Sequence, residues 1–250
     1  MAIPRKPATI MDVAAASGVS YATVSRYLNG NPHVSAKAAE RIAAVKQVNY
    51  TPNNAARSLV RQRTQTVAFV VHGQPDSLIA DPNINTILLN ANQTLGNADY
   101  QLITLISDSP AAGARIARLA SSGFADGWIL NTFHKDDPLF QRFANISVPV
   151  AISGVGYGSA IPFPTVDIDN RLASRKLTEH MLGRGYRRIA YIIGPSYLPT
   201  STPTPACPQL TTVRQPMDAF GVSLATLVLD QIEDRPFQRT GLLPTEVVAR

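Results

Sequence analysis

A short segment near the N-terminus carries side chains whose chemistry suits the reading of DNA bases. Arg26 has a guanidinium that can donate two hydrogen bonds to guanine, and Ala22 offers a methyl group that can contact the methyl of thymine. Tyr21 precedes both, and all three residues fall on one predicted helix over 21–28. We therefore expect this helix to enter the major groove and contact base edges. The alternative for Arg26 is a solvated surface arginine.

Short polar side chains lie on either side of these three residues. Their hydroxyl, amide and imidazole groups suit contacts with phosphate oxygens, which fix register without reading sequence. The expected phosphate contacts are Thr9, Ser20, Thr23, Ser25, Asn29 and His33. For His33 the alternative is a histidine that caps a loop.

Three predicted helices must position these groups. Thr9 can cap the first helix with Asp12 as its acidic partner, Ser20 can cap the second over 21–28, and Ser35 can cap a third over 36–48. Gly18 can take the left-handed conformation of a tight turn between the first two helices.

The small residue Ala14, the turn glycine and the aliphatic Val24 follow in the order of a helix-turn-helix, with Val24 expected to be buried against the first helix.

The excess positive charge is confined to the same segment. Residues 1–63 hold nine Lys/Arg and two acids, a net charge of +7, whereas the rest of the chain has a net charge of −1. A basic module joined to a near-neutral body suggests that the first part meets a polyanion. The alternative of a solubilising tail disagrees with the apolar residues of the segment.

The sequence of this module closely resembles the DNA-binding headpiece of the LacI/GalR family of bacterial transcription regulators. The runs TIMDVA (9–14) and SGVSYATVSR (17–26) carry the resemblance, together with residues 28–30, 33–37 and 49–53. The resemblance implies a domain over 1–63 that binds double-stranded operator DNA.

The resemblance also implies a hinge helix at about 52–60 that forms when two copies pack together. Asn53, Ala56 and Leu59 are then expected at the minor groove, with Leu59 as a wedge between bases. The alternative is an ordinary linker with a stray leucine.

From Thr66 the chain alternates apolar strand-like stretches with helical ones, which predicts a parallel α/β fold. The expected strands are 67–71, 100–106, 127–130, 148–152, 165–169, 188–194 and 246–249, and the expected helices are 84–96, 111–121, 172–182 and one reaching 234. The resemblance implies that residues 64–250 are a two-lobed, periplasmic-binding-protein-like effector and dimerisation domain, with 166–170 and 185–195 at the entry to the second lobe and 210–216 as the crossover back. It also implies effector contacts at Ile84, Asn131 and Ser153, with 81–84 imperfectly matching a family motif. The overall fold class is thus an α headpiece followed by an α/β body.

The second lobe departs from the family pattern. Residues 196–208 contain four prolines, which cannot continue a helix or a central strand, and they lead directly to the predicted crossover. At roughly 30 residues per βαβ unit, two or three units are missing around 196–209. We expect a marginally ordered second lobe and an incomplete effector pocket.

Other kinds of site find little support. Gly154-Val155-Gly156-Tyr157-Gly158 imitates a dinucleotide loop, but the third glycine position of that motif holds Ser159 and two prolines follow. Asp167 and Asp169 are expected as cap and solvent-facing groups rather than metal ligands. We predict no cofactor, no metal and no enzyme activity, because the four histidines form no catalytic constellation.

The single cysteine suits a reducing compartment, no apolar run approaches the ~20 residues needed to span a bilayer, and no signal-peptide core is evident. We therefore expect a cytoplasmic, nucleoid-associated protein without a membrane partner.

These observations predict a sequence-specific regulator, most simply a homodimeric repressor of carbohydrate-related genes with a sugar-like effector. The alternatives are a sugar-binding module with a vestigial headpiece and a regulator that no longer responds to an effector. A parallel α/β enzyme is a further alternative without an assignable catalytic group.

Overall fold

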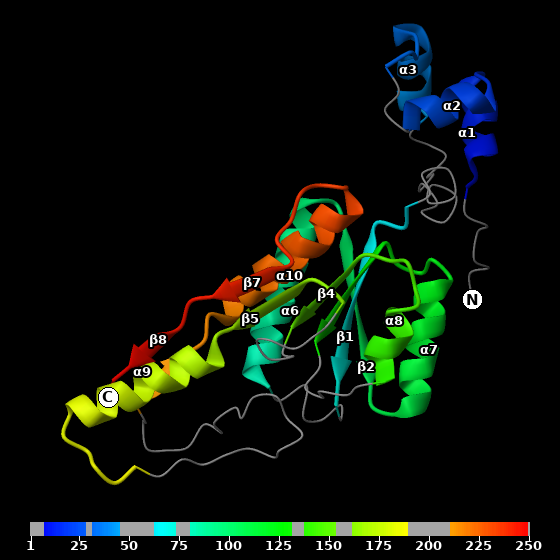
Figure 1. Ribbon diagram of the computed structural model, residues 1–250. Helices are drawn as coiled ribbons and strands as arrows, with labels where there is room; N and C mark the ends of the chain where they lie inside the picture. Colours follow the sequence, from blue (N-terminus) through cyan, green and yellow to red (C-terminus); the bar gives the residue numbers. More distant parts are fainter. Residues whose placement is uncertain are drawn as a thin grey trace, which may run out of the picture. The chain divides into compact units, whose positions relative to one another are not determined.

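The structure is a computed structural model, and it describes residues 8–28, 32–45, 63–73, 81–131, 138–153, 162–189 and 211–249. The chain divides into two compact units, residues 1–62 and 63–250 (Figure 1).

The first unit contains three short helices around one small core. They are α1 (Ile10–Ser17), α2 (Tyr21–Leu28) and α3 (Ala36–Ala43). The buried core consists of one aliphatic residue from each helix: Val13, Val24 and Ile42. The predicted third helix over 36–48 was too long, because α3 ends at Ala43 and Ala44 is its C-cap; residues 46–48 lie outside the described part of the chain.

The second unit is built on a six-stranded sheet in which all neighbouring strands are parallel. Its strands run in the order β2-β1-β3-β4-β5-β7. Their bounds are β1 (Thr66–His72), β2 (Gln101–Ser107), β3 (Gly127–Asn131), β4 (Val150–Ser153), β5 (Thr165–Ile168) and β7 (Thr240–Leu243). The parallel α/β prediction is confirmed, although β7 was missed because four residues after a polar segment give little periodic signal.

Helices cover both faces of this sheet (Figure 1). On one face lie α6 (Pro82–Asn97) and α10 (Met217–Ile232), and on the other lie α7 (Pro110–Ser121) and α8 (Pro138–Phe143). Successive strand residues alternate between the two cores, as a pleated strand requires. In β3, Ile129 packs with α6 and α10, whereas Trp128 packs with α7 and α8 and meets Phe143 edge-on at 5.3 Å. The short helix α8 was not predicted.

The helices α6 and α10 touch through their backbones. A Cβ atom on Gly221 of α10 would lie 2.4 Å from the carbonyl oxygen of Ile87 and 2.9 Å from the amide nitrogen of Ala91, both in α6. Only glycine permits this approach, which brings Phe220 and Leu224 into the core between the two helices and the sheet.

The remaining described elements form a small layer. The helix α9 (Asn170–Gly183) contacts a two-stranded antiparallel sheet of β6 (Thr212–Arg214) and β8 (Glu246–Val248). Ala173 is the single buried residue of α9. Of the predicted second-lobe entry at 166–170, the strand β5 pairs with β4 and β7 in the main sheet, and α9 follows it.

Two sequence features fall outside the described residues in whole or in part. Of the predicted strand 188–194, residues 188 and 189 have no regular structure and the rest is outside the described part. The glycine-rich stretch 154–158 and the proline-rich segment 196–208 lie outside it entirely.

Candidate nucleic-acid interface and effector edge

One face of α2 is free to meet a partner. Tyr21 is 52% exposed, and Ala22 and Arg26 are also exposed, whereas Val24 is completely buried. At about 100° per residue, Ala22 and Arg26 lie on one side of the helix and Val24 points about 180° away from them. Ala22 and Arg26 therefore share the side of α2 that faces away from the core, and Tyr21 is exposed at the first position of the helix, about 60° around it from Val24.

Local sequence signals hold α2 in place. Gly18 has a φ of 61° and ends α1 in the left-handed conformation that was predicted for it. Ser20 then caps α2, because its Oγ accepts the amide N–H of Thr23 at 3.2 Å and lies 2.9 Å from the Thr23 hydroxyl. These two hydroxyls sit beside the free N–H groups of the first turn, a place that favours phosphate oxygens.

Thr9, the first of the predicted phosphate contacts, caps the helix α1. The Thr9 amide and hydroxyl both donate to Asp12 Oδ2, at 2.7 and 2.8 Å, and the Thr9 hydroxyl accepts the Asp12 amide at 3.4 Å. The predicted capping box at the start of α1 is therefore confirmed. A phosphate contact by Thr9 stays a prediction.

The other predicted DNA contacts divide by location. Ser25 is half-buried in α2, and His33 is exposed in the turn before α3. The phosphate contact Asn29 and the hinge residues Asn53, Ala56 and Leu59 lie outside the described part of the chain.

A second polar site follows the carboxyl ends of the parallel strands. Ser107, Asn131 and Ser153 are the last residues of β2, β3 and β4, and all three are buried. Asn131 and Ser153 are register partners, and the Ser153 hydroxyl donates to Asn131 Oδ1 at 2.7 Å. Asn131 Nδ2 is buried and has no hydrogen-bond partner among the described residues. Ligands of parallel α/β folds bind at this edge of the sheet.

The structure brings two of the three predicted effector residues together. Asn131 and Ser153 are hydrogen-bonded, whereas Ile84 is 3% exposed and packs in the core with α10. Ile84 therefore stabilises that core, and a contact between its side chain and an effector stays a prediction.

Other polar residues at this edge have assignable tasks. Asp81 caps α6 by accepting the Asn83 amide at 2.8 Å, and Asp169 caps α9 by accepting the Leu172 amide at 2.8 Å. Asp167 is buried, and its Oδ1 accepts the Ile168 amide at 2.8 Å. Sequence reasoning overlooked Ser107, although a polar residue ending a predicted strand is a usable signal.

Within the described ranges, no three His, Cys, Asp or Glu side chains gather in a way that could hold a metal ion. Within the same residues, every helix is too short or too polar to cross a membrane.

The first unit matches a known family of proteins. Residues 9–53 match the profile described as "Bacterial regulatory proteins, lacI family". Over 195 residues, the chain is 36% identical to the HTH-type transcriptional regulator CelR of Thermobifida fusca, an alignment that covers 76% of this chain and 57% of that protein. The chain thus spans little more than half the length of such relatives.

Solved structures share the fold. A transcriptional regulator CelR–cellobiose complex superposes with a TM-score of 0.67 at 24% identity, covering 98% of this chain and 99% of that chain. A lac repressor dimer bound to operator and an anti-inducer superposes with a TM-score of 0.82 at 19% identity, covering 98% of both chains.

Proposed function

We propose that the chain belongs to the lacI family of bacterial regulatory proteins and is a cytoplasmic transcription regulator without enzymatic activity. In this proposal a homodimer binds a near-palindromic operator and represses carbohydrate-related genes. The observation that carries it is the exposed face of α2, where Ala22 and Arg26 lie opposite the buried Val24 and Tyr21 is exposed at the first position of the helix. The similarity to CelR supports the choice of a carbohydrate-related regulator.

The geometry of the first unit suits this task. In the proposed complex α2 lies in the major groove, where Arg26 reads a guanine and Ala22 a thymine methyl. The amino end of α2, with Ser20 and Thr23, faces the phosphate backbone, and its partial positive charge favours that position. Base and phosphate contacts then come from one helix, whose orientation is fixed by the small core.

The hinge completes the proposed mechanism. Two hinge segments at about 52–60 pair over the centre of the operator, and Leu59 enters a minor-groove base step. Any signal that separates the two hinges then releases the operator while α2 itself stays intact. This step rests on the resemblance of the hinge sequence.

Replacing Arg26 by alanine should weaken operator binding and relax sequence preference at one base pair of each half-site. The loss of a bidentate contact with guanine costs about 1–3 kcal/mol. The operator is first isolated by selection from random duplex DNA with the wild-type chain, and affinities are then measured by fluorescence anisotropy at several salt concentrations.

The matched control is Lys37→Ala, which removes the same charge from the exposed start of α3. This variant should weaken binding to all duplexes alike or leave it unchanged. If Arg26→Ala and the wild type discriminated equally between duplexes that differ at this base pair, Arg26 would be excluded as a base-reading residue. Binding that does not depend on salt would contradict the whole proposal.

For the effector we propose a carbohydrate at the edge formed by Ser107, Asn131 and Ser153. Asn131 Nδ2 is a buried donor without a partner, and such a group gains from an acceptor such as a sugar hydroxyl. The cellobiose complex of the structural relative makes cellobiose the first sugar to test.

Asn131→Ala should lower the affinity for cellobiose about tenfold in titration calorimetry, because the amide is buried and its loss removes a directed hydrogen bond. Asn145→Ala is the control, since Asn145 is exposed and its side-chain amide donates to the carbonyl oxygen of Gln141 in α8 at 2.9 Å. Equal affinity of Asn131→Ala and wild type would contradict the site.

A second candidate is a regulator that has lost its response to an effector. We propose that the second lobe lacks strand–helix units around 196–209. The support is that α9 buries only Ala173 and that its described sheet partners are two three-residue strands. Operator binding without binding of any tested sugar is the outcome expected for this candidate.

A further inference from the structure

We propose that the second unit binds a small protonated amine with an apolar body in a cavity between the end of α10 and the start of β4, and that occupancy weakens operator binding. The regulatory half rests on the proposed function, whereas the binding half does not. The cavity lies at the amino-terminal edge of the sheet, whereas the carbohydrate edge follows the carboxyl ends of the strands.

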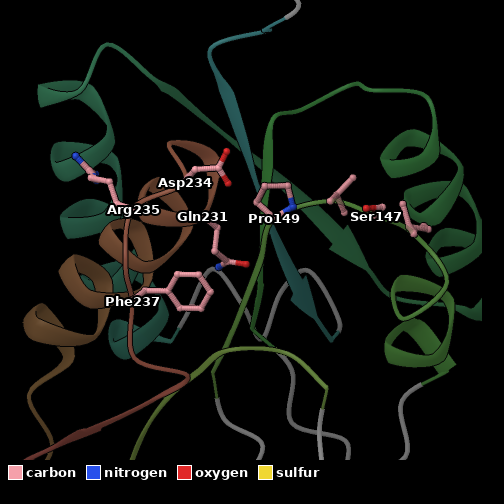
Figure 2. Close-up of a pocket in the computed structure, with 8 residues that line it drawn as sticks. Ser147, Pro149, Gln231, Asp234, Arg235 and Phe237 are labelled. Carbon is pink, nitrogen blue, oxygen red and sulfur yellow. The ribbon is translucent and has the colours of Figure 1, made fainter.

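The cavity has about 420 Å³ of space, a volume that suits a small organic molecule. Its apolar lining includes Ile146, Pro149 and the ring of Phe237, which is 42% exposed. Figure 2 shows Phe237 and Asp234 pointing toward Pro149. An aromatic ring and a carboxylate on one wall are the two groups that an organic cation requires.

The charges around the cavity favour a cation. Asp234 forms no side-chain ion pair or hydrogen bond with the described residues, whereas Arg235 pairs with Asp230 and Glu233, both at 2.8 Å. The Arg235 side chain points away from Pro149 (Figure 2). Residues 230–235 therefore have three acids against one base, a net charge of −2.

The carboxyl end of α10 adds to the negative charge around the cavity. The last turn of an α-helix has a partial negative charge, and here that turn includes Gln231 and Ile232 beside the cavity. An ammonium group next to Asp234 meets both the carboxylate and this helix end.

A neutral sugar is a poorer fit, because the wall has few free donors. Gln231 Nε2 already donates to the carbonyl oxygens of Val150 and Leu227, and its Oε1 accepts the Val150 amide. Of the neutral lining side chains, only the hydroxyl of Ser147 has a free donor. A polyol would thus leave most of its hydroxyl oxygens without a hydrogen-bond donor from the wall. A protonated amine does not need such donors, because its own N–H groups donate.

The same turn of α10 anchors the chain that emerges from the hinge. Arg63 Nη2 donates to the carbonyl oxygen of Ile232 at 3.0 Å. The next two residues are held by Asp126, which accepts the amides of Thr64 at 2.7 Å and Gln65 at 2.8 Å. Arg63 follows the predicted hinge by only a few residues in the sequence, so we expect a change at this anchor to be passed to the hinge.

Tyr100 links the anchor to the acidic turn electrostatically. Burial raises the pKa of its phenol, while the Arg63 guanidinium opposes this shift and Glu233 adds to it. Glu233 is also a partner of Arg235 in the cavity wall. A bound ammonium therefore competes with Arg63 for the negative end of α10, and we expect it to loosen the anchor.

The binding test uses the full chain and phenethylamine, followed by NMR chemical-shift titration. Asp234→Asn should weaken binding about tenfold by removing the ion pair. Its backbone should be preserved, because residue 234 has a φ of 52°, which asparagine tolerates. Asp218→Asn is the matched control, since Asp218 is an exposed acid in the first turn of the same helix.

The neutral analogue 2-phenylethanol is the control for charge. Binding of the amine in preference to the alcohol, retained in Asp218→Asn and reduced in Asp234→Asn, supports the site. Failure of the amine to bind, equal binding of the alcohol, or equal binding by wild type and Asp234→Asn would overturn it.

The regulatory half is tested by operator anisotropy with saturating phenethylamine. Affinity of the wild type should fall at least about threefold, and that of Asp234→Asn should not change. An unchanged wild-type affinity despite amine binding overturns the regulatory half. Absence of DNA binding under all conditions would contradict the proposed function and leave the NMR result standing.

Discussion

Val24→Asn should abolish operator binding while residues 63–250 stay folded. Val24 is completely buried in a core that has, among the described residues of the first unit, two other buried aliphatic side chains, Val13 and Ile42. The substitution loses about 1.5–3 kcal/mol of apolar burial and places an amide without a partner in the core, at about 1–3 kcal/mol more. A core of this size rarely supplies more than about 3–5 kcal/mol, so most first units would be unfolded.

The expected loss of operator affinity is about a hundredfold or more, because only the folded fraction can bind and a dimer needs two folded units. Fluorescence anisotropy measures the affinity, and a thermal melt followed by tryptophan fluorescence reports the second unit through Trp128. Met11→Asn is the control, since Met11 is 62% exposed on α1. Tight operator binding by Val24→Asn would show that α2 does not depend on this core.

Gly221→Val should destabilise the second unit by about 3 kcal/mol or more. The new side chain meets the backbone of α6 rather than a flexible side chain, so α6 and α10 must separate and the core between them opens. For a unit of this size the melting temperature should fall by roughly 6–12 °C.

Gly96→Val is the matched control within α6, because no atom lies within 4 Å of a Cβ at that position. It should leave the stability of the second unit almost unchanged or raise it slightly, since valine has a somewhat higher helix propensity than glycine. Calorimetry of both variants gives the comparison. Similar melting temperatures for the two variants would mean that the backbone contact of α10 with α6 does not limit stability.

The helices of the first unit could be predicted from residues that lie close together in the sequence. The capping box of Thr9 and Asp12, the left-handed Gly18 and the buried Val24 each depend on residues only a few positions apart. The end of α3 was predicted less well, because alanine-rich and polar residues continue past Ala43 without a strong stop signal.

The second unit shows where such signals become weak. Most of its strands and its long helices were predicted from apolar stretches, but the short α8, β6 and β7 were not. The strand β7 exists because it pairs with β5, some 75 residues earlier, from Thr165↔Thr240 to Ile168↔Leu243. The residues next to β7 in the sequence cannot indicate that it pairs with β5.

The sequence alone therefore determined which face of α2 is exposed and the alternation of strands and helices, because caps, turns and periodicity are local properties of the chain. Tertiary structure decided which distant residues meet. The Ser153 hydroxyl donates to Asn131, and Gly221 packs against the backbone of α6. Asp234 and Phe237 lie opposite Pro149 in one cavity. These contacts depend on strand register and helix packing, which arise from burial of apolar surface across the whole unit.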